Sequence, residues 1–289
     1  MVLDIIISSL INGSVYALLA IGFSLVFGVA RIVNIAHTAF YMVGAFLIYT
    51  ATNRLGLPPL AGMALSIVVI TLLGLLCYKL FIESIREHES AVLIGTIALA
   101  MIFQEVMLLI FGAEFQSVPS LIDGYINFFN VKVTNQQILT LGSVFIVLIA
   151  IWFLLMKTRL GLAIRATAQD REAANLMGMN EARVAMVTMG ISVGLAAFAG
   201  SIVIPLTILH PHMWMQPLIM MLSVVVLGGL GSLKGSFLGA YILATAESLV
   251  VFLLPMGAFL KGSVALSVMI LVLLIRPEGL FGVSFEEER

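Results

Sequence analysis

The chain has 289 residues, of which 62% are hydrophobic and 10% are charged. Soluble globular domains carry about 25% charged residues, so this composition excludes an ordinary soluble domain and predicts an all-α polytopic membrane protein. The formal net charge of -1 argues against a nucleic-acid partner, because phosphate recognition needs a basic face. The single cysteine, Cys77, offers no disulfide framework.

Nine apolar runs follow one another along the chain, and we interpret residues 1–289 as a single membrane domain. The runs lie at residues 5–30, 36–53, 58–78, 91–112, 138–156, 184–209, 216–230, 237–254 and 258–275. A membrane-spanning helix needs about 20 apolar residues. The seventh run is shorter and could be re-entrant, so we expect eight or nine crossings. The first run has no basic residues before it and is too long for a signal peptide, so we expect it to be retained.

Polar residues interrupt the first two runs. Asn12 and Ser14 lie within the first, and Arg31, Asn34 and His37 follow at three-residue spacing, which predicts one helical face or a broken turn. Polar side chains at membrane depth usually face protein or a water-filled cavity. We therefore assign Asn12, Ser14, Asn34 and His37 to a substrate pathway. The alternative is an interfacial turn, in which Arg31 reaches the headgroups and His37 caps a helix.

Two other sets of polar residues could carry chemistry. Glu105 and Glu247 are acids inside expected crossings, where a charge is costly and often functional. A proton relay is one interpretation, and pairing with a polar neighbour is the one we favour. The His210-Pro211-His212 turn has no third ligand nearby in sequence, so we expect no metal site and favour an extracytoplasmic turn that meets a binding protein.

Residues 157–183 form the one long polar passage and carry five of the fourteen basic residues. Asp170 is suited to cap a short helix over residues 171–177, with Gly178 just past its end, and Asn180 can cap the next helix. The short helix would lie across the membrane surface between two crossings. Its small residues and apolar edge favour a protein contact. An amphipathic helix that lies in the headgroups is the alternative.

Basic residues are distributed unevenly between the expected loops. If residues 157–183 are cytoplasmic, all but Arg54, Lys132 and Lys261 of the fourteen basic residues lie on the cytoplasmic side. The positive-inside rule then places the carboxyl terminus in the cytoplasm and the amino terminus outside.

Four segments stand in the order GVARIVNIAHTAFYMVGAF, RLGLAIRATAQDREAANLMGM, GGLGSLKGSFLGAY and RPEGLFG, along almost the whole chain. Together they resemble the permease subunits of ATP-binding-cassette importers for branched-chain amino acids, the LivH type. One departure is Thr38, where the family commonly has glycine after the histidine.

The resemblance implies a transport subunit, not an enzyme, in the inner (plasma) membrane, with the coupling segment 157–183 docked on a cytoplasmic ATPase. The implied coupling residues are Arg165, Asp170, Ala173, Ala174 and Gly178. The implied partners are a second permease subunit, two ATPase subunits, an extracytoplasmic substrate-binding protein and membrane lipid. ATP and magnesium would be used by the ATPases, and this chain would bind no cofactor. Its glycine-rich segment has Lys234 before a glycine, unlike the phosphate-binding G-x-x-x-x-G-K-[ST] loop.

Several alternatives stay open. Gly231, Gly235 and Gly239 recur at four-residue spacing, which predicts close helix packing within the subunit or, alternatively, a seam with the partner permease. The segments FYMVGAFLIY and GSFLGAYILA hint at halves related by an inverted repeat. An ion- or proton-coupled secondary transporter would use Glu105 and Glu247 as coupling groups. The same architecture could also carry urea, amides or another amino acid.

Overall fold

Seven long apolar helices dominate the computed structural model, which describes residues 2–128 and 131–282 but not the side chain of Phe128. Each of these seven is long and apolar enough to cross a membrane. They are α1 (Val2–Ala30), α3 (Pro59–Cys77) with its extension to Ile85, α5 (Glu89–Phe111), α6 (Asn135–Lys157), α9 (Glu181–Val203) with its 3-10 end at Leu206, α11 (Leu233–Leu253), and α12 (Lys261–Ile275) with a 3-10 start at Gly257. The multi-pass helical fold predicted from composition is confirmed.

Two shorter apolar helices account for the remaining expected crossings. They are α2 (His37–Tyr49), which continues as a π-helical turn over Thr50–Arg54, and α10 (Met215–Gly228). At about 1.5 Å per residue, the 14 residues of α10 extend about 21 Å, which is less than the hydrocarbon thickness of about 30 Å. The seventh apolar run was expected to be short, and the helix that it forms is shorter than the hydrocarbon core is thick.

A small β-hairpin is an addition to the all-α fold that the sequence predicted. Strand β1 (Tyr125–Phe128) pairs antiparallel with β2 (Val131–Thr134), so that Tyr125 lies opposite Thr134. The hairpin occupies the expected surface loop between α5 and α6. Its strands are too short to carry a periodic sequence signal, which is why composition did not reveal them.

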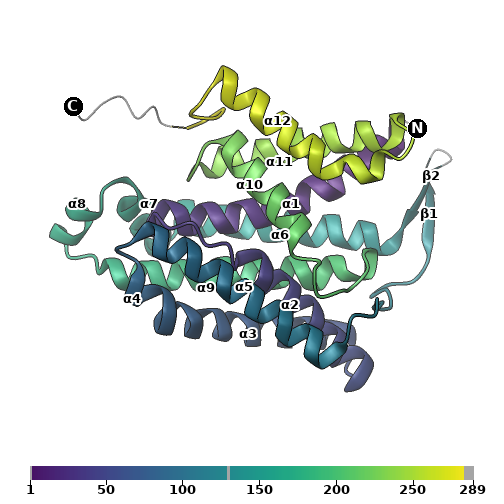
Figure 1. Cartoon of the computed structure of the whole chain (residues 1–289), viewed down its shortest axis with the longest axis horizontal. Helices are drawn as coiled ribbons and strands as arrows, with labels where there is room; N and C mark the ends of the chain where they lie inside the picture. Colours follow the sequence, from purple (N-terminus) through teal and green to yellow (C-terminus); the bar gives the residue numbers. More distant parts are fainter. Residues whose placement is uncertain (1, 129–130, 283–289) are drawn as a thin grey trace.

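The bundle has two distinct ends, which Figure 1 shows on opposite sides. Helices α7 (Arg159–Gln169) and α8 (Arg171–Leu176) lie at one end, here called the α8 end. The hairpin and the start of α1 lie at the other, here called the hairpin end. The residues after Gly282, which include the acidic tail, lie outside the described residues, so the side of the carboxyl terminus stays a prediction.

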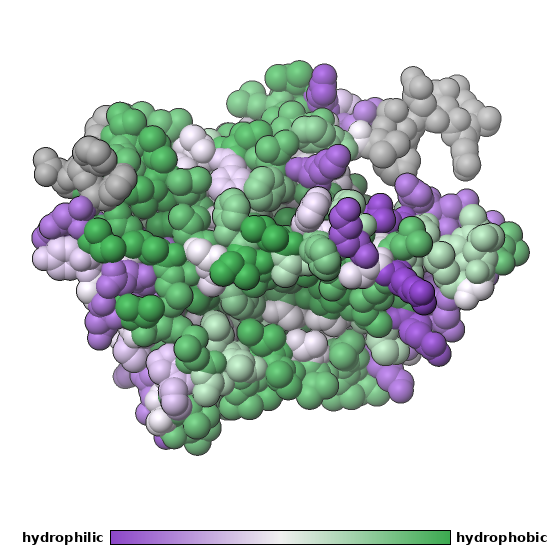
Figure 2. Space-filling model, turned by 180° about the vertical axis from the view of Figure 1, so that it is seen from behind, coloured by the Kyte–Doolittle hydropathy of each residue, from purple (hydrophilic) through white to green (hydrophobic). Residues whose placement is uncertain are grey.

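Helices α1 and α9 form the centre of the molecule. In each of them 78% of the apolar window is buried, against 17% in α6 and 6% in α12. The outer helices instead expose many apolar side chains. Figure 2 shows hydrophobic residues over most of one face, with hydrophilic residues gathered toward its two ends. This is the pattern expected of a protein whose flanks contact lipid or other membrane subunits.

The glycine stripe predicted from spacing brings helices together within this chain. A Cβ atom on Gly235 would overlap the carbonyl group of Gly228 in α10, and one on Gly239 would lie 2.9 Å from the Val224 carbonyl oxygen. Gly231 lies in the turn before α11, with φ 79°. These contacts match the favoured interpretation of packing inside the subunit.

The proposed inverted repeat does not fit the helix directions. FYMVGAFLIY lies on α2 and GSFLGAYILA lies on α11. Helix α2 follows α1 in the chain. The turn before α11 lies against the end of α1, where a Cβ atom added to Gly231 would be 3.7 Å from the Gly28 Cα. Helix α2 begins with His37 beside Gly22 and α11 begins nearer the end of α1, but both helices run toward the hairpin end. Because an inverted repeat would require opposite directions, the match between the two segments is not a sign of inverted halves.

Candidate functional site

The polar segment, residues 157–183, folds as two helices rather than one. The helix predicted after Asp170 is present as α8, and α7 is an additional helix that the polar composition had hidden. The Asp170 Oδ1 atom accepts a hydrogen bond from the Ala173 N–H at 2.9 Å, and the Asn180 Oδ1 atom accepts one from the Arg183 N–H at 2.9 Å. Gly178 has φ 84°, a left-handed conformation that favours glycine. Both predicted caps and the predicted stop are therefore observed.

Helix α8 presents an apolar edge that contacts little of its own chain. Leu176 is 88% exposed and Met177 is 81% exposed, and Figure 1 shows α8 at the periphery of the bundle. Ala173 and Gly178 are also exposed. Ala174, in contrast, is 5% exposed, so its side chain packs inside the subunit. A direct docking role for Ala174 is therefore not supported by its position.

Ion pairs fix the base of α8 to neighbouring elements. The Glu181 carboxylate lies 3.6 Å from the Arg171 guanidinium and 3.8 Å from that of Arg86. Burial lowers the pKa of Arg171, and the Glu181 charge opposes this shift. Arg165 is half-buried on α7, and its Nε atom has no hydrogen-bond partner among the described residues. The cluster joins α8, the start of α9 and the loop before α5.

In the polar row after α1, Asn34 and His37 form a buried joint and do not line a cavity, whereas Arg31 is exposed. Residues 31–36 are not an α-helix, and Arg31 has φ 48°, so the broken turn is the correct one of the two predicted forms. The Asn34 Nδ2 atom lies 3.6 Å from the Met189 sulfur. The His37 Nδ1 atom lies 3.1 Å from the Ser192 hydroxyl. Both contacts are to α9, and both polar side chains are buried.

Ser14 also contacts protein on all sides. Its hydroxyl donates to the Leu10 carbonyl at 2.7 Å and lies 2.9 Å from the Tyr241 hydroxyl on α11. Of the four residues assigned to a substrate pathway, Asn12 lines the cavity described next, whereas Ser14, Asn34 and His37 hold helices together.

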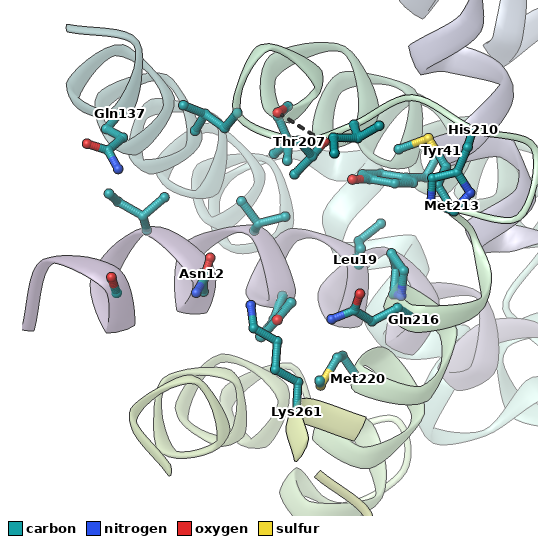
Figure 3. A pocket seen from close by; sticks show the side chains of 18 of the residues that line it. Asn12, Leu19, Tyr41, Gln137, Thr207, His210, Met213, Gln216, Met220 and Lys261 are labelled. Atoms are coloured by element: carbon teal, nitrogen blue, oxygen red, sulfur yellow. Dashed lines mark hydrogen bonds between the residues drawn. The ribbon is translucent and has the colours of Figure 1, made fainter. Parts of the chain in front are cut away.

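A cavity of about 450 Å³ lies toward the hairpin end, between α1, the loop after α9 and the starts of α10 and α12 (Figure 3). Its apolar wall is made by Ile11, Val15, Leu19, Val203, Leu206, Ile208, Met213, Pro217 and Met220. Its polar residues are Ser8, Asn12, Tyr16, Tyr41, Gln137, Thr207, His210, His212, Gln216 and Lys261. This volume is within the range of about 300–1,000 Å³ typical of small-ligand pockets.

An ion pair lies at the edge of this cavity. The Lys261 ammonium is 3.0 Å from the Glu247 Oε1 atom, and the Tyr16 hydroxyl donates to Glu247 Oε2 at 2.7 Å. Glu247 is thus paired with polar neighbours, which is the interpretation favoured from sequence. Lys261 was predicted only as a basic residue of an outer loop. Its position at the start of the last apolar run, one helix after an intramembrane acid, was the signal that could have identified it.

Glu105 is separate from the cavity. It is exposed on α5 and accepts a hydrogen bond from the Gln104 side chain at 3.2 Å. Gln104 in turn accepts one from the Trp214 indole at 2.9 Å. This chain of contacts links α5 to the residue before α10, so Glu105 also has the polar neighbour that was favoured.

His210 and His212 also line the cavity. The His210 ring meets the Phe115 ring edge-on, with centroids 5.6 Å apart, and backbone hydrogen bonds between Gln116 and Leu209 hold this loop in place. Burial lowers the pKa of His210, and the nearby His212 adds to the shift. Within residues 2–128 and 131–282 there is no group of three metal-ligating side chains.

Comparison with known proteins agrees with this architecture. Residues 5–275 match a family model described as the permease component of branched-chain amino acid transport systems. The permease protein BraD of Pseudomonas aeruginosa, named for high-affinity branched-chain amino acid transport, is 30% identical over 96% of this chain and 94% of its own. The corresponding LivH protein of Escherichia coli is 30% identical over 93% of this chain and 92% of its own. The LivM permease protein of Escherichia coli is 23% identical over 92% of this chain and 67% of its own.

One solved structure has a similar fold. It is PsaBC from Streptococcus pneumoniae in complex with Fab, with a TM-score of 0.53 and 14% identity over 94% of this chain and 91% of that one. At this identity the likeness concerns the fold alone.

Proposed function

The chain belongs to the branched-chain amino acid transport permease family, and from this membership we propose that it is the permease subunit of an ATP-binding-cassette importer. The family is one of transport permeases, and the chain is a multi-pass membrane protein. We propose that it forms half of a translocation pathway for leucine, isoleucine or valine. We place it in the inner membrane with a cytoplasmic carboxyl terminus, because of the uneven distribution of basic residues.

The observation that carries this proposal is the exposed apolar edge of α8. Two large apolar side chains, Leu176 and Met177, stand almost free of the chain at the polar end of a membrane protein. Burying each of them would contribute about 1.5–3 kcal/mol, which is a sufficient reason for a partner to cover them. In the proposal, α8 is the coupling helix, and a cytoplasmic ATPase is the partner.

We assign the coupling residues different roles. Asp170 caps α8 and Gly178 ends it, so both set its direction. Ala173 is exposed and small, which would permit close approach of the ATPase surface. Ala174 would act through packing within the subunit, and the half-buried Arg165 would act from α7.

Movement of α8 would reach the centre of the bundle through the Glu181 cluster. Glu181 begins α9, and its carboxylate lies near Arg171 of α8 and Arg86 of the loop before α5. Because α9 is one of the two central helices, closure of the ATPases could turn the bundle as a rigid body between inward- and outward-open states.

The proposed partners follow from the same assignment. The chain resembles both a LivH and a LivM permease of Escherichia coli, which supports a second permease subunit, and we propose that this partner is a different homologous chain. Two ATPase subunits would hydrolyse ATP with magnesium, and an extracytoplasmic binding protein would deliver the substrate. This chain would itself bind no nucleotide.

The experiment that tests the function is uptake of radiolabelled leucine into proteoliposomes that contain this subunit, its partner permease and the ATPases. We expect uptake that requires both internal ATP and the external binding protein. Uptake by this chain alone, driven by a proton or sodium gradient, would overturn the proposal in favour of a secondary transporter. Glu105→Gln is the variant that separates the two, since an importer should retain most of its ATP-driven uptake with this change.

A further inference from the structure

Among the described residues that line the cavity at the hairpin end, Lys261 is the one lysine, arginine, aspartate or glutamate. The acid that pairs with it, Glu247, lies behind the cavity wall and is itself almost fully buried. The cavity therefore meets the positive member of the pair, while the negative member is screened from it.

Glu247 holds the ammonium group without using all its donors. A lysine ammonium has three N–H donors, and the Glu247 Oε1 atom lies 3.0 Å away as its ion-pair partner, without a hydrogen bond between them. The Tyr16 hydroxyl fixes the other carboxylate oxygen at 2.7 Å, so the acid cannot swing away. The Lys261 side chain remains 31% exposed, which leaves donors available on the cavity side.

The surroundings of Lys261 are suited to the rest of an aliphatic amino acid. In the view of Figure 3, Lys261 reaches from α12 toward α1, with the amides of Asn12 and Gln216 on either side of its tip. Both amide carbonyl groups can accept hydrogen bonds from the ammonium group of a bound amino acid. Val15 and Met220 belong to the apolar wall of the same cavity, where an aliphatic side chain can be buried.

We infer that Lys261 binds the carboxylate of a small aliphatic α-amino acid in this cavity, at a station on the transport path inside the permease itself. The inference rests on the proposed function and narrows its substrate class. Urea and uncharged amides have no carboxylate, so they would leave the Lys261 ammonium without its partner. The selectivity of the importer would then reside in this subunit as well as in the binding protein.

Lys261 could also act only as the counter-ion of Glu247, and a second variant is needed to separate this structural role from substrate binding. Lys261→Met alone leaves a buried carboxylate unpaired and can prevent folding. The double variant Lys261→Met with Glu247→Gln removes both charges and keeps the side-chain volumes close to the original. Neutral replacements of buried ion pairs are often tolerated, so this protein should fold.

The test compares leucine with leucinamide, which has an uncharged amide in place of the carboxylate. Binding of both is measured on the complete permease–ATPase complex in nanodiscs, without the binding protein. We expect the wild-type complex to prefer leucine by about 10- to 100-fold, the range of a charge-assisted hydrogen bond. In the double variant the preference should fall to about 2-fold or less, and Lys261→Arg should retain most of it.

Lys132→Met is the matched control, because Lys132 lies at the hairpin end over the Tyr125 ring and does not line the cavity. It should keep the wild-type preference for leucine. A preference that persists in the double variant overturns the inference, and so does a wild-type complex that transports leucine but shows no such preference. ATP-driven leucine uptake is measured in parallel on the wild-type complex with its binding protein. If that uptake is absent, the proposed function itself fails, so the two failures are distinguishable.

Discussion

The residues that cap and end α8 all lie within residues 157–183, whereas the residues that line the cavity range from Ser8 to Lys261 and come from helices across the whole chain. The first region is organised by contacts between near neighbours, such as the cap from Asp170 to Ala173. The second depends on pairs such as Tyr16 and Glu247, which are 231 residues apart. Changes on the outside of α8 should therefore alter docking alone, and changes around the cavity should alter folding and binding together.

The largest effect is expected from Leu176→Asp combined with Met177→Asp. Both side chains are exposed, so the subunit should fold normally, while a docked ATPase would lose two buried apolar groups. The loss should weaken ATPase association by at least about 100-fold and reduce ATP-driven uptake to background. Association is measured by titration of the purified ATPase against the permease in nanodiscs.

Ile126→Asp is the control for this docking surface, because Ile126 is an exposed apolar residue at the hairpin end. It should leave ATPase association unchanged. Normal association of the Leu176→Asp, Met177→Asp variant would show that α8 is not the coupling helix, and the contrast between the two regions would lose its functional meaning.

A second prediction concerns the packing that holds the cavity together. Gly200 on α9 lies against the backbone carbonyl of Tyr41, a residue that lines the cavity, so a methyl group there would collide with main chain. Gly200→Ala should lower the free energy of unfolding by about 1–3 kcal/mol and weaken leucine binding. Thermal unfolding in detergent and leucine binding in nanodiscs are the measurements.

Gly142→Ala is matched to it, since an added Cβ on Gly142 in α6 meets nothing within 4 Å. This change should be neutral or stabilise the helix by up to about 1 kcal/mol. Equal stability of the two alanine variants would mean that the close contact between α9 and α2 can relax, and that the cavity is less dependent on distant packing than we infer.

A smaller, local effect is expected from Asp170→Ala. The change removes the acceptor of the Ala173 N–H and should cost about 1 kcal/mol, confined to α8. Amide hydrogen exchange at Ala173 should accelerate about 5-fold, with no change in exchange around the cavity. Asp170→Asn keeps an acceptor oxygen and should retain most of the protection. Faster exchange throughout the bundle would indicate that α8 is not a locally organised element.

The smallest effect concerns pH. Burial and the nearby His212 lower the pKa of His210 below its ordinary value of 6.5. Above about pH 6.5 the histidine is neutral in the folded and unfolded loop alike and contributes no pH dependence. As the pH falls through 6.5, the unfolded loop takes up a proton before the folded one, so stability should fall by less than about 1 kcal/mol. Thermal unfolding of wild type and His210→Gln between about pH 8 and pH 5 measures this, and identical pH profiles would contradict it.

Local signals made the fold of the polar segment 157–183 predictable, whereas no local signal predicted the residues that line the cavity. Asp170 and Asn180 accept hydrogen bonds from N–H groups three positions away, and Gly178 ends α8 through its own backbone conformation, so their roles could be predicted before the fold was known. The orientation of Ala174 could not be predicted, because it depends on which side of α8 meets the rest of the chain. Helix α7 was missed because a polar stretch offers no apolar run to mark it.

Polarity alone also could not separate a buried joint from a cavity wall. His37 and Asn12 are both polar residues in apolar surroundings, but His37 meets Ser192, 155 positions away, whereas Asn12 faces open volume. The sequence alone does not show which residues His37 and Asn12 meet in the folded chain. Lys261 was missed for the same reason, since its role depends on Glu247 and on the cavity beside it.

The sequence by itself determined the membrane class, the positions of the apolar helices, the two caps around α8 and, through its motifs, the family. These depend on composition and on interactions within one or two helical turns. Only the tertiary structure decided which polar residues face the cavity, which face of α8 is exposed and that Lys261 completes the Tyr16 and Glu247 contact. Those properties arise when helices distant in the chain pack against one another, and close packing leaves room for an open volume only where the shapes of several helices fail to fill it.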